Sequence, residues 1–167
     1  MKFVTSLALL ATATTVVASP VQKIFNLVSS GASDESKHGL YLSTKHEDPL
    51  NSKAVFRAQS DAADFYFVNG TVRWDAPNGA PYAIALIPGS NLQGDVGINV
   101  SPTTGSEGFS LTSEKELTTD NDDFGGWLVC PGDGGPQGLF YENSSVGDDV
   151  PEGCEVIQLD AVYKTSS

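Results

Sequence analysis

The sequence contains few of the residues that catalysis and metal binding use most often. It has two histidines, two cysteines and one methionine in 167 residues. It contains no G-x-S-x-G elbow, no H-E-x-x-H motif, no Walker loop and no dinucleotide-binding fingerprint. His38 and His46 flank an expected strand and are interpreted as surface residues. We therefore predict no catalytic residue, no metal site and no cofactor.

Basic residues are also scarce. Nine lysines and arginines stand against 21 aspartates and glutamates, so the formal net charge is −12. Nucleic acids and anionic membranes are bound through clustered Lys and Arg, because their phosphates are negative. This composition argues against both as partners. A strongly acidic surface suits solubility in an extracellular medium.

The chain begins with the pattern of a secretory signal peptide. Lys2 precedes an apolar and small-residue stretch from Val4 to Val17, and Ala18 ends it before Ser19. The stretch is shorter than the roughly 20 apolar residues of a membrane-spanning helix and is interrupted by Thr and Ser. We expect residues 1–18 to be removed and residues 19–167 to form a single all-β domain, secreted as a monomer to the exterior or the cell wall.

The two cysteines, Cys130 and Cys154, allow one intramolecular pairing. In an oxidising secretory compartment this spacing predicts a disulfide. Closing a loop of this length contributes about 3 kcal/mol in the chain-entropy model.

Three Asn-X-Ser/Thr sequons make the chain a candidate glycoprotein. They begin at Asn69, Asn99 and Asn143. Asn69-Gly70 is also a hairpin-turn dipeptide, so we expect its side chain at a solvated loop tip. Pro102 follows the second sequon and handicaps its modification.

Short alternating runs, broken every several residues by Gly, Pro, Asn, Asp and Ser, predict an all-β fold. The expected strands are Phe25–Val28, Leu40–Ser43, Ala54–Arg57, Phe65–Val68, Thr71–Trp74, Tyr82–Ile87, Val96–Val100, Phe109–Thr112, Glu116–Thr119, Trp127–Cys130, Leu139–Glu142 and Glu155–Tyr163. The turns between them are rich in Gly and Pro.

These strands can be arranged as three weak repeats. The first strand of each would begin at Phe25, Tyr82 and Trp127, and the second at His38, Gly94 and Gln137. The third segments would be the hairpins from Asp64 and Gly108 and the strand from Gly153. Three such units predict a β-trefoil-like closed barrel. A two-sheet β-sandwich and an open barrel are the alternatives, because they bury alternating faces equally well.

Several short motifs resemble those of a group of secreted fungal proteins. They are the signal segment, FYFVNGTVRW, Gly108-Phe109, WLVC at Trp127–Cys130 and PEGC at Pro151–Cys154. Together they resemble small secreted proteins of ascomycete fungi, including the phialide-associated cell-wall protein and mould proteins labelled IgE-binding. The resemblance implies residence outside the cell or in its wall and no established chemistry.

Exposed aromatic side chains are the best candidates for ligand contacts. Trp74 and Tyr66 lie on the expected hairpin around Asn69-Gly70, and Arg73 offers a hydrogen-bonding fork. Aromatic faces stack on sugar rings, so these three residues are the predicted polysaccharide contacts. In the competing interpretation Trp74 belongs to the core.

Two function classes remain. The first is a non-enzymatic extracellular or wall-associated protein that binds polysaccharide or host molecules, including host proteins. The second is a small hydrolase that uses paired carboxylates, which cannot be chosen by sequence among so many acids. A trefoil-type protease inhibitor is a further alternative, with Pro49–Ala54 or Pro131–Gly138 as its exposed loop.

Signal-peptide removal makes a direct prediction. Mass spectrometry of the protein from culture medium should show Ser19, or a residue close to it, at the amino terminus. Secreted protein that retains Met1 would refute the interpretation.

Overall fold

The computed structural model describes residues 22–100, 105–132, 134–147 and 149–165. The expected signal peptide, residues 1–18, lies outside them. The described residues form an all-β fold with two short 3₁₀ helices, η1 (Glu35–Lys37) and η2 (Gln59–Asp61). The strands are β1 (Phe25–Ser30), β2 (Tyr41–Asp48), β3 (Asn51–Arg57), β4 (Phe65–Val68), β5 (Thr71–Trp74), β6 (Tyr82–Ile87), β7 (Gln93–Val100), β8 (Phe109–Leu111), β9 (Leu117–Thr119), β10 (Phe124–Cys130), β11 (Gly138–Asn143) and β12 (Glu155–Tyr163).

The all-β prediction is confirmed, and every expected strand overlaps an observed one. The bounds of β4, β5, β6 and β12 agree with the prediction. The largest difference is in β2, which continues through the polar residues after Ser43 to Asp48. Polar sequence did not end the strand because the ladder to β3 continues, with Lys45 opposite Lys53 and His46 opposite Ser52.

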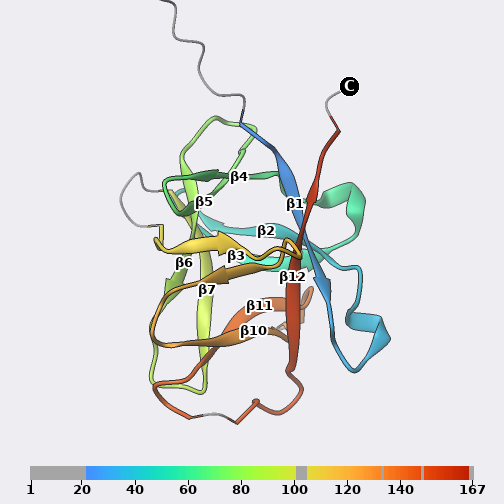
Figure 1. The fold of residues 1–167 in the computed structure, drawn as a ribbon, viewed down its shortest axis with the longest axis vertical. Helices are drawn as coiled ribbons and strands as arrows, with labels where there is room; N and C mark the ends of the chain where they lie inside the picture. The colour runs from blue at the N-terminus through green and yellow to red at the C-terminus, as the bar shows by residue number, and fades with distance from the viewer. Residues whose placement is uncertain (1–21, 101–104, 133, 148, 166–167) are drawn as a thin grey trace, which may run out of the picture.

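Ten of the described strands form one sheet that closes on itself as a barrel. Its order is β10-β12-β1-β2-β3-β11-β7-β6-β5-β4, and further pairings join β1 to β4 and β10 to β11. β1 and β12 run antiparallel side by side along one side of the molecule (Figure 1). β8 and β9 form a separate hairpin.

Three strands that are far apart in the sequence meet at one place. β3 pairs with β7 through Asn51–Lys53, β7 pairs with β11 through residues 93–95, and β11 pairs with β3 through Gly138 and Val55. Each strand therefore pairs with both of the others. The arrangement leaves an outer face on which side chains from all three strands converge.

The core lies inside the barrel and is built from the inward positions of the strands. Its fully buried members include Phe25, Leu27, Phe65, Ile84 and Leu159. Trp127 is buried, and its Nε1 donates a hydrogen bond of 2.7 Å to the carbonyl oxygen of Leu117.

One inward position of β11 holds an aromatic ring that faces a glycine on β7. Tyr141 of β11 is almost fully buried and lies opposite Gly94 of β7. A Cβ atom at Gly94 would overlap the Tyr141 ring. Glycine at position 94 is therefore required by the close approach of the ring.

We predict that Gly94→Ala destabilises the protein by about 1–3 kcal/mol, because a well-packed interior tolerates added atoms poorly. Urea unfolding measures this difference. Gly89→Ala is the control, since the nearest atom to a Cβ at Gly89 is 4.0 Å away. Equal unfolding midpoints for the two variants would contradict this account of the core.

Candidate functional site

A groove of about 430 Å³ lies on the outer face where β3, β7 and β11 meet. Its volume is within the range of about 300–1,000 Å³ that is usual for small-molecule sites. The residues that line it are Lys45, Glu47, Asn51, Ser52, Lys53, Ala54, Val55, Ile87, Gln93, Asp95, Val96, Gly97, Asn99, Pro131, Gly132, Pro136, Gly138, Leu139 and Phe140.

The groove is hollow because its floor has little side-chain volume. Residues along a strand alternate between the two faces of the sheet. Ala54, Val96 and Leu139 belong to the buried core cluster, so the residues next to each of them on its strand face outward. Two of the outward positions near the strand junction are Gly97 and Gly138.

Phe140 is the aromatic side chain of the groove. It is half-buried and lies between Leu128 of β10 and Asp95 of β7 in the strand ladders. A Cβ atom at Gly138 would lie 2.7 Å from Phe140 Cε2, so the ring rests close to the Gly138 backbone. The absence of a side chain at Gly138 therefore leaves room for the ring. Pro131 and Pro136 add rigid apolar surface to the same groove.

Amide side chains supply the polar part of the lining. Asn51 and Asn99 lie opposite each other in the β3–β7 ladder, and Gln93 lies further along β7. Asn51 Nδ2 donates to both carboxylate oxygens of Asp48, at 3.1 and 3.0 Å. These bonds fix the orientation of the Asn51 amide before any ligand arrives.

The charged residues of the groove are two lysines and two acids. Lys45 and Lys53 lie directly opposite each other in the β2–β3 ladder. Like charges in this arrangement repel. Glu47 offsets the repulsion, with its Oε1 3.2 Å from Lys53 Nζ, and Asp95 lies on β7 across the groove.

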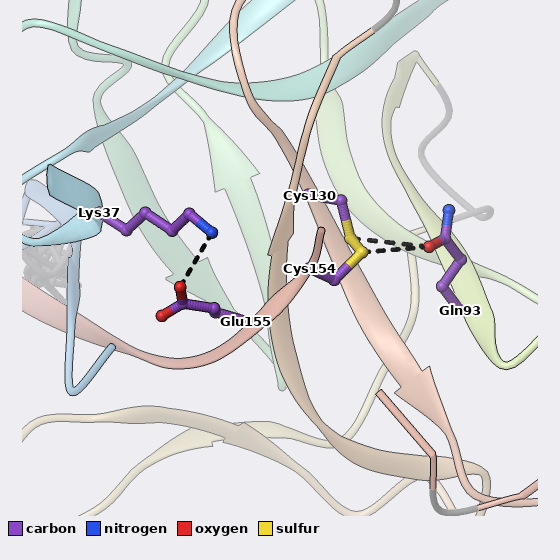
Figure 2. Close-up of a disulfide and its surroundings, with 5 residues drawn as sticks. All are labelled: Lys37, Gln93, Cys130, Cys154 and Glu155. Carbon is purple, nitrogen blue, oxygen red and sulfur yellow. Dashed lines mark hydrogen bonds and ion pairs between the residues drawn. A yellow bond between two sulfur atoms is a disulfide. The ribbon is translucent and has the colours of Figure 1, made fainter. Parts of the chain in front are cut away.

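The predicted disulfide is confirmed and lies near the groove. Cys130 and Cys154 join the end of β10 to the segment before β12, with an S–S distance of 2.05 Å (Figure 2). Gln93 Oε1 approaches the two sulfurs to 3.6 and 3.4 Å. These are contacts without a hydrogen bond, because the sulfurs of a disulfide carry no proton. Gln93, which lines the groove, thus rests against the disulfide.

An ion pair lies on the other side of the disulfide. Lys37 Nζ is 3.1 Å from Glu155 Oε1, and the backbone N–H of Asp34 donates to Glu155 Oε2 at 3.0 Å (Figure 2). The hydrogen bond from Asp34 is the main cause that holds the pKa of Glu155 below its ordinary value, followed by the bond from Lys37. These contacts tie the η1 segment to the start of β12.

The structure does not bring the three predicted ligand residues together. Trp74 lies opposite Phe65 on the core side, and its ring centroid is 4.8 Å from that of Tyr82. Tyr66 and Arg73 lie opposite each other on the other face of the hairpin. Arg73 is held by a hydrogen bond from its Nη1 to the carbonyl oxygen of Pro81. Strand alternation places Trp74 and Arg73 on opposite faces of the hairpin.

The sequons have different environments. Asn69 is exposed in the β4–β5 turn, as expected, and Asn99 lines the groove. Asn143 is 2% exposed, and its Nδ2 donates to the carbonyl oxygens of Gly89 and Asn91 at 3.0 and 3.3 Å. A glycan at Asn143 does not fit this fold, because its attachment atom is buried and hydrogen-bonded.

In the described parts of the chain, no group of three or more His, Cys, Asp or Glu side chains could hold a metal ion. The acidic turn before β10 uses Asn121 Oδ1 to accept the Asp123 N–H at 2.9 Å, which is a turn-forming role. No helix among the described residues is long and apolar enough to span a membrane.

Residues 22–163 match the family described as "Domain of unknown function (DUF7907)". The chain belongs to this family. Comparison with curated proteins and with solved structures finds no match. The matched residues include every strand of the described barrel, and the family description names no ligand for the groove.

The contacts of Glu155 predict a pH dependence of stability. A carboxyl whose pKa is lowered in the folded state stabilises that state above its unfolded pKa, and the stabilisation is lost as the pH falls through the folded pKa. The wild-type protein should therefore be more stable than Glu155→Gln near pH 7, and the difference should shrink as the pH falls below about 4.3. Urea unfolding across this range measures it. A difference that stays constant down to acid pH would count against the role of the carboxylate.

Proposed function

We propose that this protein is a secreted, non-enzymatic extracellular or cell-wall protein of fungal origin that binds polysaccharide in the groove. The observation that carries the proposal is the position of Phe140, beside prolines and amides at the junction of β3, β7 and β11. Ligand sites commonly combine apolar and aromatic surface with a few fixed polar groups.

The lining matches the chemistry of a sugar ring. A hexose offers one face of C–H groups and a rim of hydroxyls. Phe140 provides an aromatic face on which the C–H groups of the sugar ring can stack. Asn99 and Gln93 carry amides that both donate and accept hydrogen bonds, and Asn51, whose Nδ2 is engaged by Asp48, offers its Oδ1 as an acceptor.

Two features support action outside the cell. The amino-terminal segment has the pattern of a signal peptide. The disulfide between Cys130 and Cys154 belongs to an oxidising environment. The expected resemblance to small secreted proteins of ascomycete fungi agrees with both features and remains part of the proposal.

We further propose that the barrel is a β-trefoil. The support is that pairings recur at an interval of four strands: β3, β7 and β11 pair mutually, β2–β3, β6–β7 and β10–β11 are hairpins, and β4–β5, β8–β9 and β12–β1 are pairs. In this scheme β2, rather than β1, corresponds to β6 and β10. The repeats predicted from sequence are then shifted by one strand in the first unit. The groove would lie on the pseudo-threefold axis.

One observation favours a second candidate function, recognition of a host protein such as a protease. Leu50 is 59% exposed at the tip of the β2–β3 hairpin, within the predicted Pro49–Ala54 loop. Asp48 Oδ1 accepts the N–H groups of Leu50 and Asn51 at 2.8 and 3.0 Å, which makes the tip rigid. A preorganised apolar anchor loses little entropy on binding.

The hydrolase alternative has weaker support. Glu47 and Asp95 are the acidic side chains of the groove, and the Glu47 carboxylate is engaged by Lys53 at 3.2 Å. A general acid or nucleophile must instead be available to the glycosidic bond.

The proposal predicts retention of the protein on at least one of insoluble chitin, β-glucan and mannan. Phe140→Ala should reduce the affinity about tenfold or more, which is typical for the loss of a central aromatic contact. A sedimentation assay measures the bound fraction, and the melting temperature of each variant shows that it is folded.

Tyr66→Ala is the matched control, because Tyr66 is also half-buried but lies on the β4–β5 hairpin. We expect it to bind as the wild type does. Loss of binding in Tyr66→Ala with unchanged Phe140→Ala would move the site to that hairpin. Retention of the wild-type protein no higher than that of an unrelated acidic protein would remove the polysaccharide proposal.

A further inference from the structure

The groove differs in charge from the rest of the protein. Its ionisable lining consists of Lys45 and Lys53 against Glu47 and Asp95, so its formal charge is zero. The chain as a whole carries −12, and all of this net charge therefore lies outside the groove.

This contrast bears on the kind of ligand that the groove accepts. An acidic polymer would be repelled by the surrounding surface and would gain no net attraction inside. A polycation would be attracted to the acidic surface everywhere, without preference for the groove. Only an uncharged ligand would obtain its binding energy entirely from contacts that the groove has and the rest of the surface lacks.

The lysines are not arranged as a free anion site. Lys53 is engaged with Glu47 at 3.2 Å, and Lys45 faces Lys53 across the ladder. An anion bound there would have to displace the Glu47 carboxylate or share Lys53 with it. Asn99, Gln93 and the Oδ1 acceptor of Asn51 are uncharged, so a hydroxyl can bond to them without displacing an ion pair.

We propose that the ligand of the groove is an uncharged hexose-based polysaccharide segment, with one ring stacked on Phe140 and its hydroxyls bonded to the amides. This inference rests on the proposed polysaccharide-binding function and adds the ligand class. Pro131 and Pro136 bound the apolar part of the groove, and Gly138 holds the ring of Phe140 in position.

The test is calorimetric titration of the mature protein with two sets of short oligosaccharides. The uncharged set contains β-1,3-glucan, cellulose, mannan and N-acetylated chitin fragments; the charged set contains polygalacturonate and fully deacetylated chitosan fragments. Because Asn99 is also a sequon residue, protein with Ser101→Ala is titrated in parallel as a reference without a glycan at that position.

We expect at least one uncharged fragment to bind, with a Kd that changes less than about twofold between low and high salt, since screening acts on charges. Phe140→Ala should weaken this binding about tenfold or more while the variant keeps a cooperative unfolding transition.

Each negative result would overturn a different part of the proposal. Tighter binding of polygalacturonate or chitosan, or strong weakening of the best ligand by salt, would overturn the uncharged class while leaving polysaccharide binding in place. Uncharged binding that survives Phe140→Ala would overturn the assignment to the groove. Absence of binding to every fragment and to the insoluble polymers would overturn the proposed function itself.

Discussion

The mutual pairing of β3, β7 and β11 is the constraint on which the rest of the structure depends. It joins three hairpins that are distant in sequence, places Tyr141 in the core against Gly94, and creates the outer face that carries the groove. If one of these ladders were lost, the backbone groups of the strand junction would lack partners, which is costly in a buried position. Fold and candidate site therefore depend on the same contacts.

The sequence predicted the elements of the fold well and their assembly less well. Alternation and Gly-Pro turns are local signals, and they located all the strands, with identical bounds for β4, β5, β6 and β12. The disulfide was predictable because Cys130 and Cys154 allow one pairing. The order of strands around the barrel depends on pairings such as Val55 with Gly138, which no local pattern reports.

The groove was missed for the same reason. Its residues come from separate strands, and Phe140 is one of several aromatics that alternate with apolar neighbours. The available signal was the Gly-x-Phe spacing of Gly138 and Phe140, since a glycine two residues away on the same face leaves room for a ring. Trp74 was a candidate because of the chemistry of its side chain, but its contacts depend on the face of the strand on which it lies. Likewise, the sequon at Asn143 is a local motif that carries no information about burial.

The geometry of the groove and the charge of the protein together bear on the kind of ligand that would bind. The chain is acidic as a whole, and its groove has no formal net charge. The aromatic ring and the amides of the groove lie on paired strands, and Pro131 and Pro136 lie on the loop between β10 and β11. Under the proposed function, such a surface would bind an uncharged polymer and repel anionic ones.

The most direct measurement of the central claim is an amide and side-chain NMR titration of the ¹⁵N-labelled mature protein with the uncharged oligosaccharide that binds best. The account predicts that the shifts concentrate on the backbone amides of Gly97, Gly138 and Phe140 and on the side-chain amide of Asn99, while the indole N–H of Trp74 stays in place. Shifts centred on Trp74, Tyr66 and Arg73, with the strand junction unaffected, would contradict it.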